Sequence, residues 1–308
     1  MAGAGPAVAV VNAGRVGYYL GWMRARLCGR RIPLSCSIIL TERCNLSCRH
    51  CTVANLGHQE PRFDEVCADL KLLYSTGARV LVITGGEPFM WTDGARSLDD
   101  VVRMAHSIGF FRVVVCTNGT FPLESSADYL WVSLDGSPKE HDELRGGVYR
   151  RVVGNMRRSH HPHLSVNFTV SQVNWSKFDR AARMMLQDRR VRSVLFHLFT
   201  LYIGSDPQLR LTPAQRRLVV SRIWRLKQRY PLRVTNSFDG IRVLASNHWP
   251  RPVWGSVVAN RGRLTTCCCR AGISDAAVCA ECGCTPAMET FVLQQLRPLA
   301  LLENLRYL

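Results

Sequence analysis

Three closely spaced cysteines, Cys44, Cys48 and Cys51, are the residues of this chain best suited to chemistry. They follow the apolar run 34–40, which predicts a strand, so we expect them on the loop where that strand ends. Three thiolates can hold three irons of a four-iron, four-sulfur cluster, and a spacing this tight lets one short loop surround it. The fourth iron is then left open to another ligand.

A zinc ion is the alternative occupant of this loop. Zinc favours four Cys or His ligands, and His50, Cys28 or Cys36 could supply the fourth beside the three thiolates. The spacing of the cysteines leaves both metals open, and the motifs at the following strand ends favour the iron-sulfur cluster.

Three polar motifs close the next three predicted strands in order. They occupy residues 83–88, 117–120 and 133–136, and the residues they place at strand ends are Gly85, Gly86, Glu87, Asn118, Ser133 and Asp135. Glycine suits a strand end where backbone must approach a ligand closely, because it has no Cβ. Side chains at these ends are expected to meet at one edge of a parallel sheet.

Together, the cysteine loop and the three motifs resemble the signature of the radical S-adenosylmethionine (radical SAM) superfamily. The resemblance implies that Cys44, Cys48 and Cys51 bind a [4Fe-4S] cluster and that SAM chelates the open iron. It also implies reductive cleavage of SAM to a 5'-deoxyadenosyl radical. The SAM-binding positions that it assigns are His50, Gly85, Gly86, Glu87, Asn118, Ser133 and Asp135.

The positions of these motifs follow from an alternation of strands and helices between residues 34 and 200. Predicted strands span 34–40, 80–84, 112–117, 129–133, 164–170 and 194–200, and predicted helices span 63–76, 98–108, 148–158 and 177–187. This spacing indicates parallel βα units with right-handed crossovers. We therefore expect an α/β fold, a partial (β/α)6 TIM-like barrel, which is also the fold that the resemblance implies.

The stretch 137–147 after the fourth strand resembles one found in radical SAM enzymes with cysteine-rich extensions. Its residues His141, Asp142 and Arg145 are either polar contacts to SAM or a network at the start of a helix, where acidic side chains are favoured. Both interpretations stay open at this stage. No residue is assigned a catalytic role from the sequence.

Length and composition indicate one large folded domain with a small appendage. The chain has 308 residues, 47% of them hydrophobic and 20% charged, and 13 cysteines clustered at metal-ligand spacings. The formal net charge of +17 would attract anionic lipids, nucleic acid or a phosphorylated substrate. We expect segments 1–33, 34–235 and 236–308 to be, respectively, a basic aromatic lead-in, the barrel and a cysteine-rich extension.

Residues 1–33 interleave aromatic and aliphatic side chains with arginines such as Arg15, Arg24 and Arg31. No uncharged run approaches the ~18 residues of a membrane span, so neither a transmembrane helix nor a signal peptide is expected. An interfacial helix in peripheral contact with a membrane and a helix covering the open bottom of the barrel are both compatible with this composition. We expect a cytoplasmic protein.

A second group of cysteines lies in the C-terminal extension. Cys267, Cys268 and Cys269 precede Cys279, Cys282 and Cys284, and six thiols within 18 positions is a density typical of a metal site. The expected ligands are Cys269, Cys279, Cys282 and Cys284. The superfamily's SPASM and twitch extensions imply an auxiliary [4Fe-4S] cluster at this place, and zinc remains the alternative.

Three functions are compatible with the sequence. The segments 14–20, 132–136, 254–255 and 260–262, together with a closing Cys-x2-Cys followed by a Pro-Leu helix, resemble hopanoid-modifying radical SAM enzymes. This narrower resemblance favours a radical SAM enzyme that modifies a lipid or other apolar substrate, with an electron donor such as flavodoxin or ferredoxin. A maturase of a ribosomally made peptide is the alternative, although residues 1–33 are too short for a peptide-recognition domain. A basic metalloprotein that binds nucleic acid is the alternative from another class, and no nucleic acid is expected as a partner.

Overall fold

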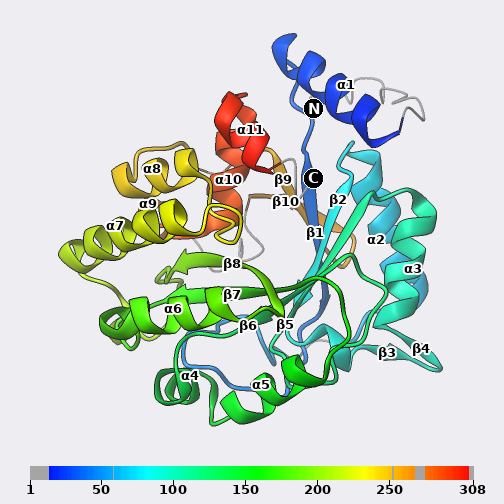
Figure 1. Cartoon of the computed structure of the whole chain (residues 1–308). Coiled ribbons are helices and arrows are strands. Elements are labelled where there is room, and N and C mark those ends of the chain that lie inside the picture. The colour runs from blue at the N-terminus through cyan, green and yellow to red at the C-terminus, as the bar shows by residue number, and fades with distance from the viewer. Residues whose placement is uncertain (1–13, 58, 252, 268–274, 305–308) are drawn as a thin grey trace.

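The computed structural model describes residues 14–304 except 58, 252 and 268–274. Its centre is an eight-stranded sheet with the order β10-β9-β1-β2-β5-β6-β7-β8, curved into a half-barrel (Figure 1). The six expected strands all form and pair in parallel: β1 Ser35–Thr41, β2 Val80–Gly85, β5 Arg112–Thr117, β6 Tyr129–Ser133, β7 Leu164–Val170 and β8 Val191–Leu198. The α/β partial-barrel prediction is confirmed.

Helices connect these strands and cover the outer face of the sheet (Figure 1). They are α2 Phe63–Ser75, α3 Leu98–Ile108, α4 Pro138–Arg145, α5 Tyr149–Arg158 and α6 Phe178–Gln187, with the short elements η1 Pro88–Met90, β3 Thr92–Asp93, β4 Arg96–Ser97 and η2 Trp175–Lys177. Local sequence sets their ends. Ser97 and Asp100 form a capping box at the start of α3, and Gly109 ends it with a φ of 113°.

Alternation along the strands separates a helix-packed face from an inner face. On β7, for example, Val166, Phe168 and Val170 are fully buried in the main hydrophobic core, while Asn167 and Thr169 between them are only partly buried. Successive side chains of a strand point to opposite faces, so these polar residues lie on the inner face of the half-barrel. The inner face therefore stays polar enough to receive a ligand.

The C-terminal extension continues the same sheet and adds a second helical layer. It consists of η3 Pro207–Leu209, α7 Pro213–Arg229, α8 Phe238–Ser246, β9 Ser256–Asn260, β10 Arg263–Thr266, α9 Ala276–Ala280, α10 Thr285–Gln294 and α11 Pro298–Asn304. Strand β9 pairs in parallel with β1, starting with Ser256 opposite Ser35, and β10 pairs with β9 in antiparallel fashion. The sequence did not predict these two strands, which join the expected 34–235 barrel to the expected 236–308 extension.

Helix α1, Arg15–Leu27, covers the ends of the strands opposite the cysteine loop. Its Tyr18 and Trp22 are buried against Leu34, and the Tyr18 hydroxyl donates to the Gly77 carbonyl at 2.8 Å. Because Gly77 precedes β2, the aromatic side of the helix caps the bottom of the barrel, which is one of the two arrangements expected for residues 1–33. In the described part of the chain, no helix combines the length and apolarity needed to span a bilayer.

Glu289 of α10 is a buried carboxyl that makes stability depend on pH. Burial raises its pKa from 4.5 to about 7, and its Oε1 accepts the Ser237 N–H at 2.8 Å. The native state holds this proton more tightly than the unfolded chain does, so the free energy of unfolding falls as pH rises from about 4.5 to 7. We expect Glu289→Gln, which keeps an acceptor for Ser237, to be more stable than the wild type at pH 8 by up to about 3 kcal/mol. Urea denaturation should show this difference vanish near pH 4, and a difference independent of pH would contradict it.

Candidate active site

The cysteine loop follows β1 and is held in shape by a single asparagine. The side-chain oxygen of Asn55 accepts the Cys44 N–H at 2.8 Å, and the Asn55 N–H donates to the Glu42 carbonyl at 2.6 Å. Asn55 adopts a left-handed conformation with a φ of 58°, which asparagine tolerates better than most residues. No periodicity or spacing in the sequence marks this residue, and it was not predicted.

The three thiols of the loop, those of Cys44, Cys48 and Cys51, are partly buried and close enough to influence one another electrostatically. Burial raises the pKa of Cys48 to about 11, with further upward contributions from Cys51 and Cys44, while the Arg145 charge opposes the rise. Burial likewise raises the pKa of the Cys44 thiol. Metal binding must therefore displace protons from these thiols.

Gly85 and Gly86 lie where β2 meets the cysteine loop. The Gly86 N–H donates to the Thr41 carbonyl at 2.7 Å, and the Glu87 N–H donates to the Arg43 carbonyl at 2.8 Å. A Cβ at Gly86 would overlap the Arg43 carbonyl oxygen. Close approach was expected here toward a ligand, whereas in the structure the backbone approached is that of the cysteine loop itself.

We expect Gly86→Ala to push the loop away from β2. The added methyl group would meet the backbone of Arg43, which cannot rotate away as a side chain could. We therefore expect a destabilisation of about 1–3 kcal/mol. Chemical denaturation and iron content after reconstitution would measure it. Gly21→Ala is the matched control, because nothing lies within 4 Å of the added Cβ in α1. Equal stability of the two variants would contradict the close packing.

Glu87 is fully buried at the end of β2 and joins it to β5. Its carboxylate accepts the Thr117 hydroxyl at 2.8 Å and the Asn118 N–H at 2.6 Å, and it caps η1 through Phe89. Burial raises the pKa of Glu87 to about 7, and these donors only partly oppose that rise. The assignment of Glu87 as a SAM-binding position stays a prediction.

Asn118 connects the end of β5 to the cysteine loop. Its side-chain nitrogen lies 3.6 Å from the Cys44 sulfur and donates to the Asn45 side-chain oxygen at 2.9 Å. Its own oxygen accepts the Thr120 hydroxyl at 2.7 Å, and Asn45 donates to the same Thr120. The motif at 117–120 is thus brought together with the first cysteine, as its place at a strand end predicted.

A buried ion pair lies on the other side of the loop. The Asp135 carboxylate is fully buried and accepts Arg145 Nε at 2.6 Å and the Thr169 N–H at 2.7 Å. Burial alone would raise the pKa of Asp135, but the Arg145 charge and the neighbouring donors outweigh it and lower that pKa. His50 Nε2 is 3.9 Å from the same carboxylate, and Arg145 Nη1 is 4.0 Å from the Cys48 sulfur. A positive charge is therefore fixed beside the thiols.

Two other residues of the stretch 137–147, His141 and Asp142, act where helices begin. His141 accepts the Asp135 N–H at 3.2 Å, and Asp142 accepts the Tyr149 N–H at 2.7 Å where α5 begins. These two fit the helix-start interpretation, whereas Arg145 reaches the cysteine loop. Ser133 pairs in register with Asn167 on the partly buried inner face, and no hydrogen bond is described between its side chain and the cysteine loop.

The fourth ligands considered for zinc lie in different surroundings. Cys36, near the start of β1, is fully buried and its thiol lies 3.6 Å from the Val80 carbonyl oxygen, while Cys28 is exposed at the end of α1. Both are at the opposite end of the barrel from the loop. Within the described residues, no three His, Cys, Asp or Glu side chains form a group placed to hold a single metal ion.

Three C-terminal cysteines also come together. Cys267, directly after β10, interacts electrostatically with Cys279 and Cys282, and burial raises the pKa of Cys267 to about 11. The Cys284 N–H points at the Cys282 sulfur at 3.4 Å. Cys269, the expected ligand from the triplet, lies outside the described residues. Of the triplet, the described residue that meets the other thiols is Cys267.

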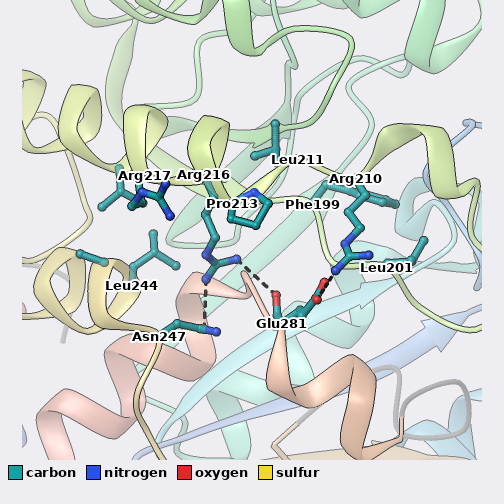
Figure 2. A pocket seen from close by; sticks show the side chains of 12 residues that line it. Phe199, Leu201, Arg210, Leu211, Pro213, Arg216, Arg217, Leu244, Asn247 and Glu281 are labelled. Carbon is teal, nitrogen blue, oxygen red and sulfur yellow. Dashed lines mark hydrogen bonds and ion pairs between the residues drawn. The ribbon is translucent and has the colours of Figure 1, made fainter.

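A cavity of about 270 Å³ lies beside this cysteine group, between α7, α8 and the segment after β8 (Figure 2). Arg216 crosses it to reach the Glu281 carbonyl and the Asn247 side chain, and Arg210 makes an ion pair with the Glu281 carboxylate. Through Arg49, which pairs with Asp206 at 2.7 Å, the same segment also contacts the first cysteine loop. The segment 199–212 thus contacts both the loop of Cys44, Cys48 and Cys51 and the loop that carries Cys279 and Cys282.

Comparison with known proteins adds two independent findings. The model of the radical SAM superfamily matches residues 38–183. The AdoMet-dependent heme synthase of Methanosarcina barkeri is 28% identical over 179 residues, which is 53% of this chain and 49% of that protein. The antilisterial bacteriocin subtilosin biosynthesis protein AlbA of Bacillus subtilis is 33% identical over 129 residues, 37% of this chain and 27% of that protein. The chain therefore spans about half the length of the heme synthase, or less for AlbA.

Solved structures agree with the fold. Streptococcus suis SuiB bound to S-adenosylmethionine superposes with a TM-score of 0.62 at 13% identity, over 84% of this chain and 67% of that chain. SuiB bound to the precursor peptide SuiA gives the same TM-score at 11% identity, over 90% and 70% of the two chains. At these identities the similarity supports the architecture alone.

Proposed function

Residues 38–183 belong to the radical SAM superfamily, a family that uses a [4Fe-4S] cluster and SAM, and from this we propose that the chain cleaves SAM reductively to modify an organic substrate. One observation carries the proposal. Cys44, Cys48 and Cys51 share one loop at the carboxyl edge of a parallel sheet and interact electrostatically, and the Cys48 sulfur lies 4.0 Å from Nη1 of the buried Arg145. Open parallel sheets bind their ligands at this edge.

The donor set fits the cluster, because thiolates are its usual ligands and Arg145 offsets part of their negative charge. When bound, cluster and SAM supply an electron and a 5'-deoxyadenosyl radical. The chain's own residues hold the cluster through the three thiolates, keep the loop against β2 through Gly85 and Gly86, and present polar groups from Glu87 and Asn118. His50 of the loop lies 3.9 Å from the Asp135 carboxylate, and Ser133 lies on the inner face.

Formation of 5'-deoxyadenosine tests this activity. The protein would be reconstituted with iron and sulfide, reduced with dithionite and incubated with SAM, and the products would be separated by chromatography. We expect 5'-deoxyadenosine that depends on both iron and reductant. A reconstituted protein that binds iron and yields none would contradict the proposal, and would favour the alternative of a non-enzymatic metalloprotein that binds nucleic acid through its arginines.

For the substrate, we propose a lipid or another large apolar molecule. The outer face of α1 supports this choice, because Val16, Leu20 and Leu27 are 74%, 57% and 78% exposed and alternate with the exposed Arg24. A helix with this pattern suits peripheral contact with an anionic membrane surface. The electron donor would be a flavodoxin or ferredoxin.

A ribosomally made peptide is the second candidate. AlbA and the sporulation killing factor maturation protein SkfB are similar in sequence, and SuiB has been solved with a precursor peptide. Substrate-dependent turnover separates the candidates. Lipid extracts, tetrapyrroles and peptide pools would be incubated with the reduced enzyme and compared by mass spectrometry with the Cys48→Ala variant. Changes confined to the peptide pool would overturn the lipid proposal.

We further propose that the C-terminal cysteines hold a second centre, an auxiliary [4Fe-4S] cluster, in preference to the zinc alternative, because no three described side chains are placed to hold a single metal ion. Its ligands would be Cys267, Cys279, Cys282 and Cys284, with Cys267 in the place expected for Cys269. The mutual electrostatic influence of Cys267, Cys279 and Cys282 supports this set. The metal content of a variant that lacks Cys44, Cys48 and Cys51 would test the second centre separately.

A further inference from the structure

One asparagine, Asn247, holds two arginines next to the loop that carries the C-terminal cysteines Cys279 and Cys282. The side-chain oxygen of Asn247 accepts Arg251 Nη2 at 2.7 Å and Arg216 Nη2 at 3.2 Å, and its nitrogen donates to the Ala280 carbonyl at 2.8 Å. Asn247 ends α8 in a left-handed conformation with a φ of 53°. Because Ala280 neighbours the cysteines of α9, this one residue ties both guanidinium groups to the thiol-bearing loop (Figure 2 shows the Arg216 side).

Arg251 is the arginine that interacts electrostatically with Cys267, Cys279 and Cys282. Its guanidinium stacks on Trp249, 4.1 Å from the ring centre, and Nη1 donates to the Trp249 carbonyl at 3.5 Å. Burial lowers the pKa of Arg251, and Cys282, Cys279 and Cys267 are the groups that oppose this. Its Nε is buried without a hydrogen-bond partner in the described part of the chain.

Arg216 approaches the same cysteines from α7. It donates to the Glu281 carbonyl at 3.3 Å and to the Cys282 carbonyl at 3.4 Å, and burial lowers its pKa. The nearest carboxylate, that of Glu281, is engaged by Arg210. Neither Arg216 nor Arg251 forms an ion pair with a carboxylate among the described residues.

Arg216 and Arg251 therefore leave two partly buried positive charges next to the loop that carries Cys279 and Cys282. Removing a guanidinium from water costs several kcal/mol unless an opposite charge is close by. Thiolates held by a metal would supply that charge, because metal binding removes the thiol protons. The protein has thus placed the counter-charge for a centre that is anionic only when its metal is bound.

We propose that Arg251 is a positioning residue that stabilises an anionic metal-thiolate centre at Cys267, Cys279 and Cys282. Asn247 orients the Arg251 side chain, and Arg216 contributes a second positive charge. This inference rests on the second centre proposed above and concerns the charge of that iron-sulfur cluster. The nearby cation also favours its reduced state, since reduction adds a negative charge.

The test isolates the C-terminal centre in a Cys44→Ala/Cys48→Ala/Cys51→Ala background. Iron with sulfide is loaded, and the rate of metal loss to a chelator is measured. Arg251→Gln should lose metal about 10- to 100-fold faster, the range typical of groups that support metal ligands from outside the coordination shell. Arg251→Lys, which keeps the charge, should recover part of this. Arg225→Gln is the matched control, since Arg225 is exposed on α7.

The outcomes separate the two proposals. A loaded background protein whose Arg251→Gln variant matches Arg225→Gln in metal loss would overturn the role of Arg251 and leave the second centre intact. A background protein that takes up no iron would remove the second centre, and this inference with it. Circular dichroism of the metal-free variants distinguishes misfolding from weak metal binding. Arg251→Gln should also shift the midpoint potential of the cluster to more negative values.

Discussion

Cys48→Ala is expected to abolish 5'-deoxyadenosine formation. Cys48 is the most central of the three loop cysteines, since its thiol interacts electrostatically with Cys44, Cys51 and Arg145. Removing one of three thiolates leaves the cluster with two protein ligands, and its fourth iron is then no longer unique. We expect cleavage to fall to the level measured without added iron, and iron bound at the loop to fall with it.

The control for this experiment is another cysteine outside the site. Cys67, on α2, is partly buried, and the groups that influence its thiol are Lys71, Arg96 and Asp64, none of them a cysteine. Cys67→Ser should retain wild-type cleavage. Iron quantification and chromatography of the products measure both variants. Cleavage that persists in Cys48→Ala at the wild-type rate would contradict the assignment of Cys48 as a cluster ligand.

Arg145→Met is expected to destabilise the metal-free protein by about 3–5 kcal/mol, the usual cost of removing one partner of a buried ion pair. Its partner Asp135 is fully buried and would keep only the Thr169 N–H as a close donor. The same variant removes the positive charge beside Cys48, so cluster loading should weaken as well. Denaturation in urea gives the stability, and iron analysis gives the loading.

An exposed ion pair provides the comparison. Arg103 on α3 pairs with Asp99 and Asp100, and its side chain is 60% exposed, so Arg103→Met should cost no more than about 1 kcal/mol. The double variant Asp135→Asn/Arg145→Met should recover part of the lost stability, because no unpaired buried charge remains. If Arg145→Met and Arg103→Met were equally stable, the buried pair would not have the importance assigned to it.

The barrel could be predicted because its strands and helices are marked locally. The strands at 112–117, 129–133 and 164–170 have the predicted bounds, since each is a β-branched run ended by polar residues. Helix α7 also begins at a local signal, with the Thr212 side chain accepting the Gln215 N–H as its cap and Pro213 in the first turn. Such signals depend on a few neighbouring residues and survive in the folded chain.

Strands β9 and β10 were missed for the opposite reason. The run 256–260 is short and gives little alternation, and what makes it a strand is pairing with β1, more than 200 positions earlier. Long-range pairing of this kind leaves no local mark. Aromatic residues of α1 were open to two interpretations because burial of Tyr18 and Trp22 depends on Leu34 and Gly77, which the composition of residues 1–33 does not reveal.

The site was predictable at the level of motifs and not at the level of contacts. Order along the chain placed Cys44, Glu87, Asn118 and Asp135 at strand ends that share one edge. The supporting contacts could not be foreseen, because the hydrogen bond from Cys44 to Asn55 and the pairing of Arg145 with Asp135 depend on loop conformations. Close packing of Gly85 and Gly86 against the backbone of Thr41 and Arg43 is a contact that the motif did not reveal, and their assignment to SAM stays a prediction.

The most direct test of the central claim is electron paramagnetic resonance of the reduced loop cluster. A Cys279→Ser/Cys282→Ser variant would remove ligands of the second centre, so that the signal arises from the loop of Cys44, Cys48 and Cys51. We predict a reduced [4Fe-4S] signal whose g values change when SAM is added, because SAM binds the iron that has no thiolate. A signal identical with and without SAM, or a loop that retains zinc and no iron, would contradict the account.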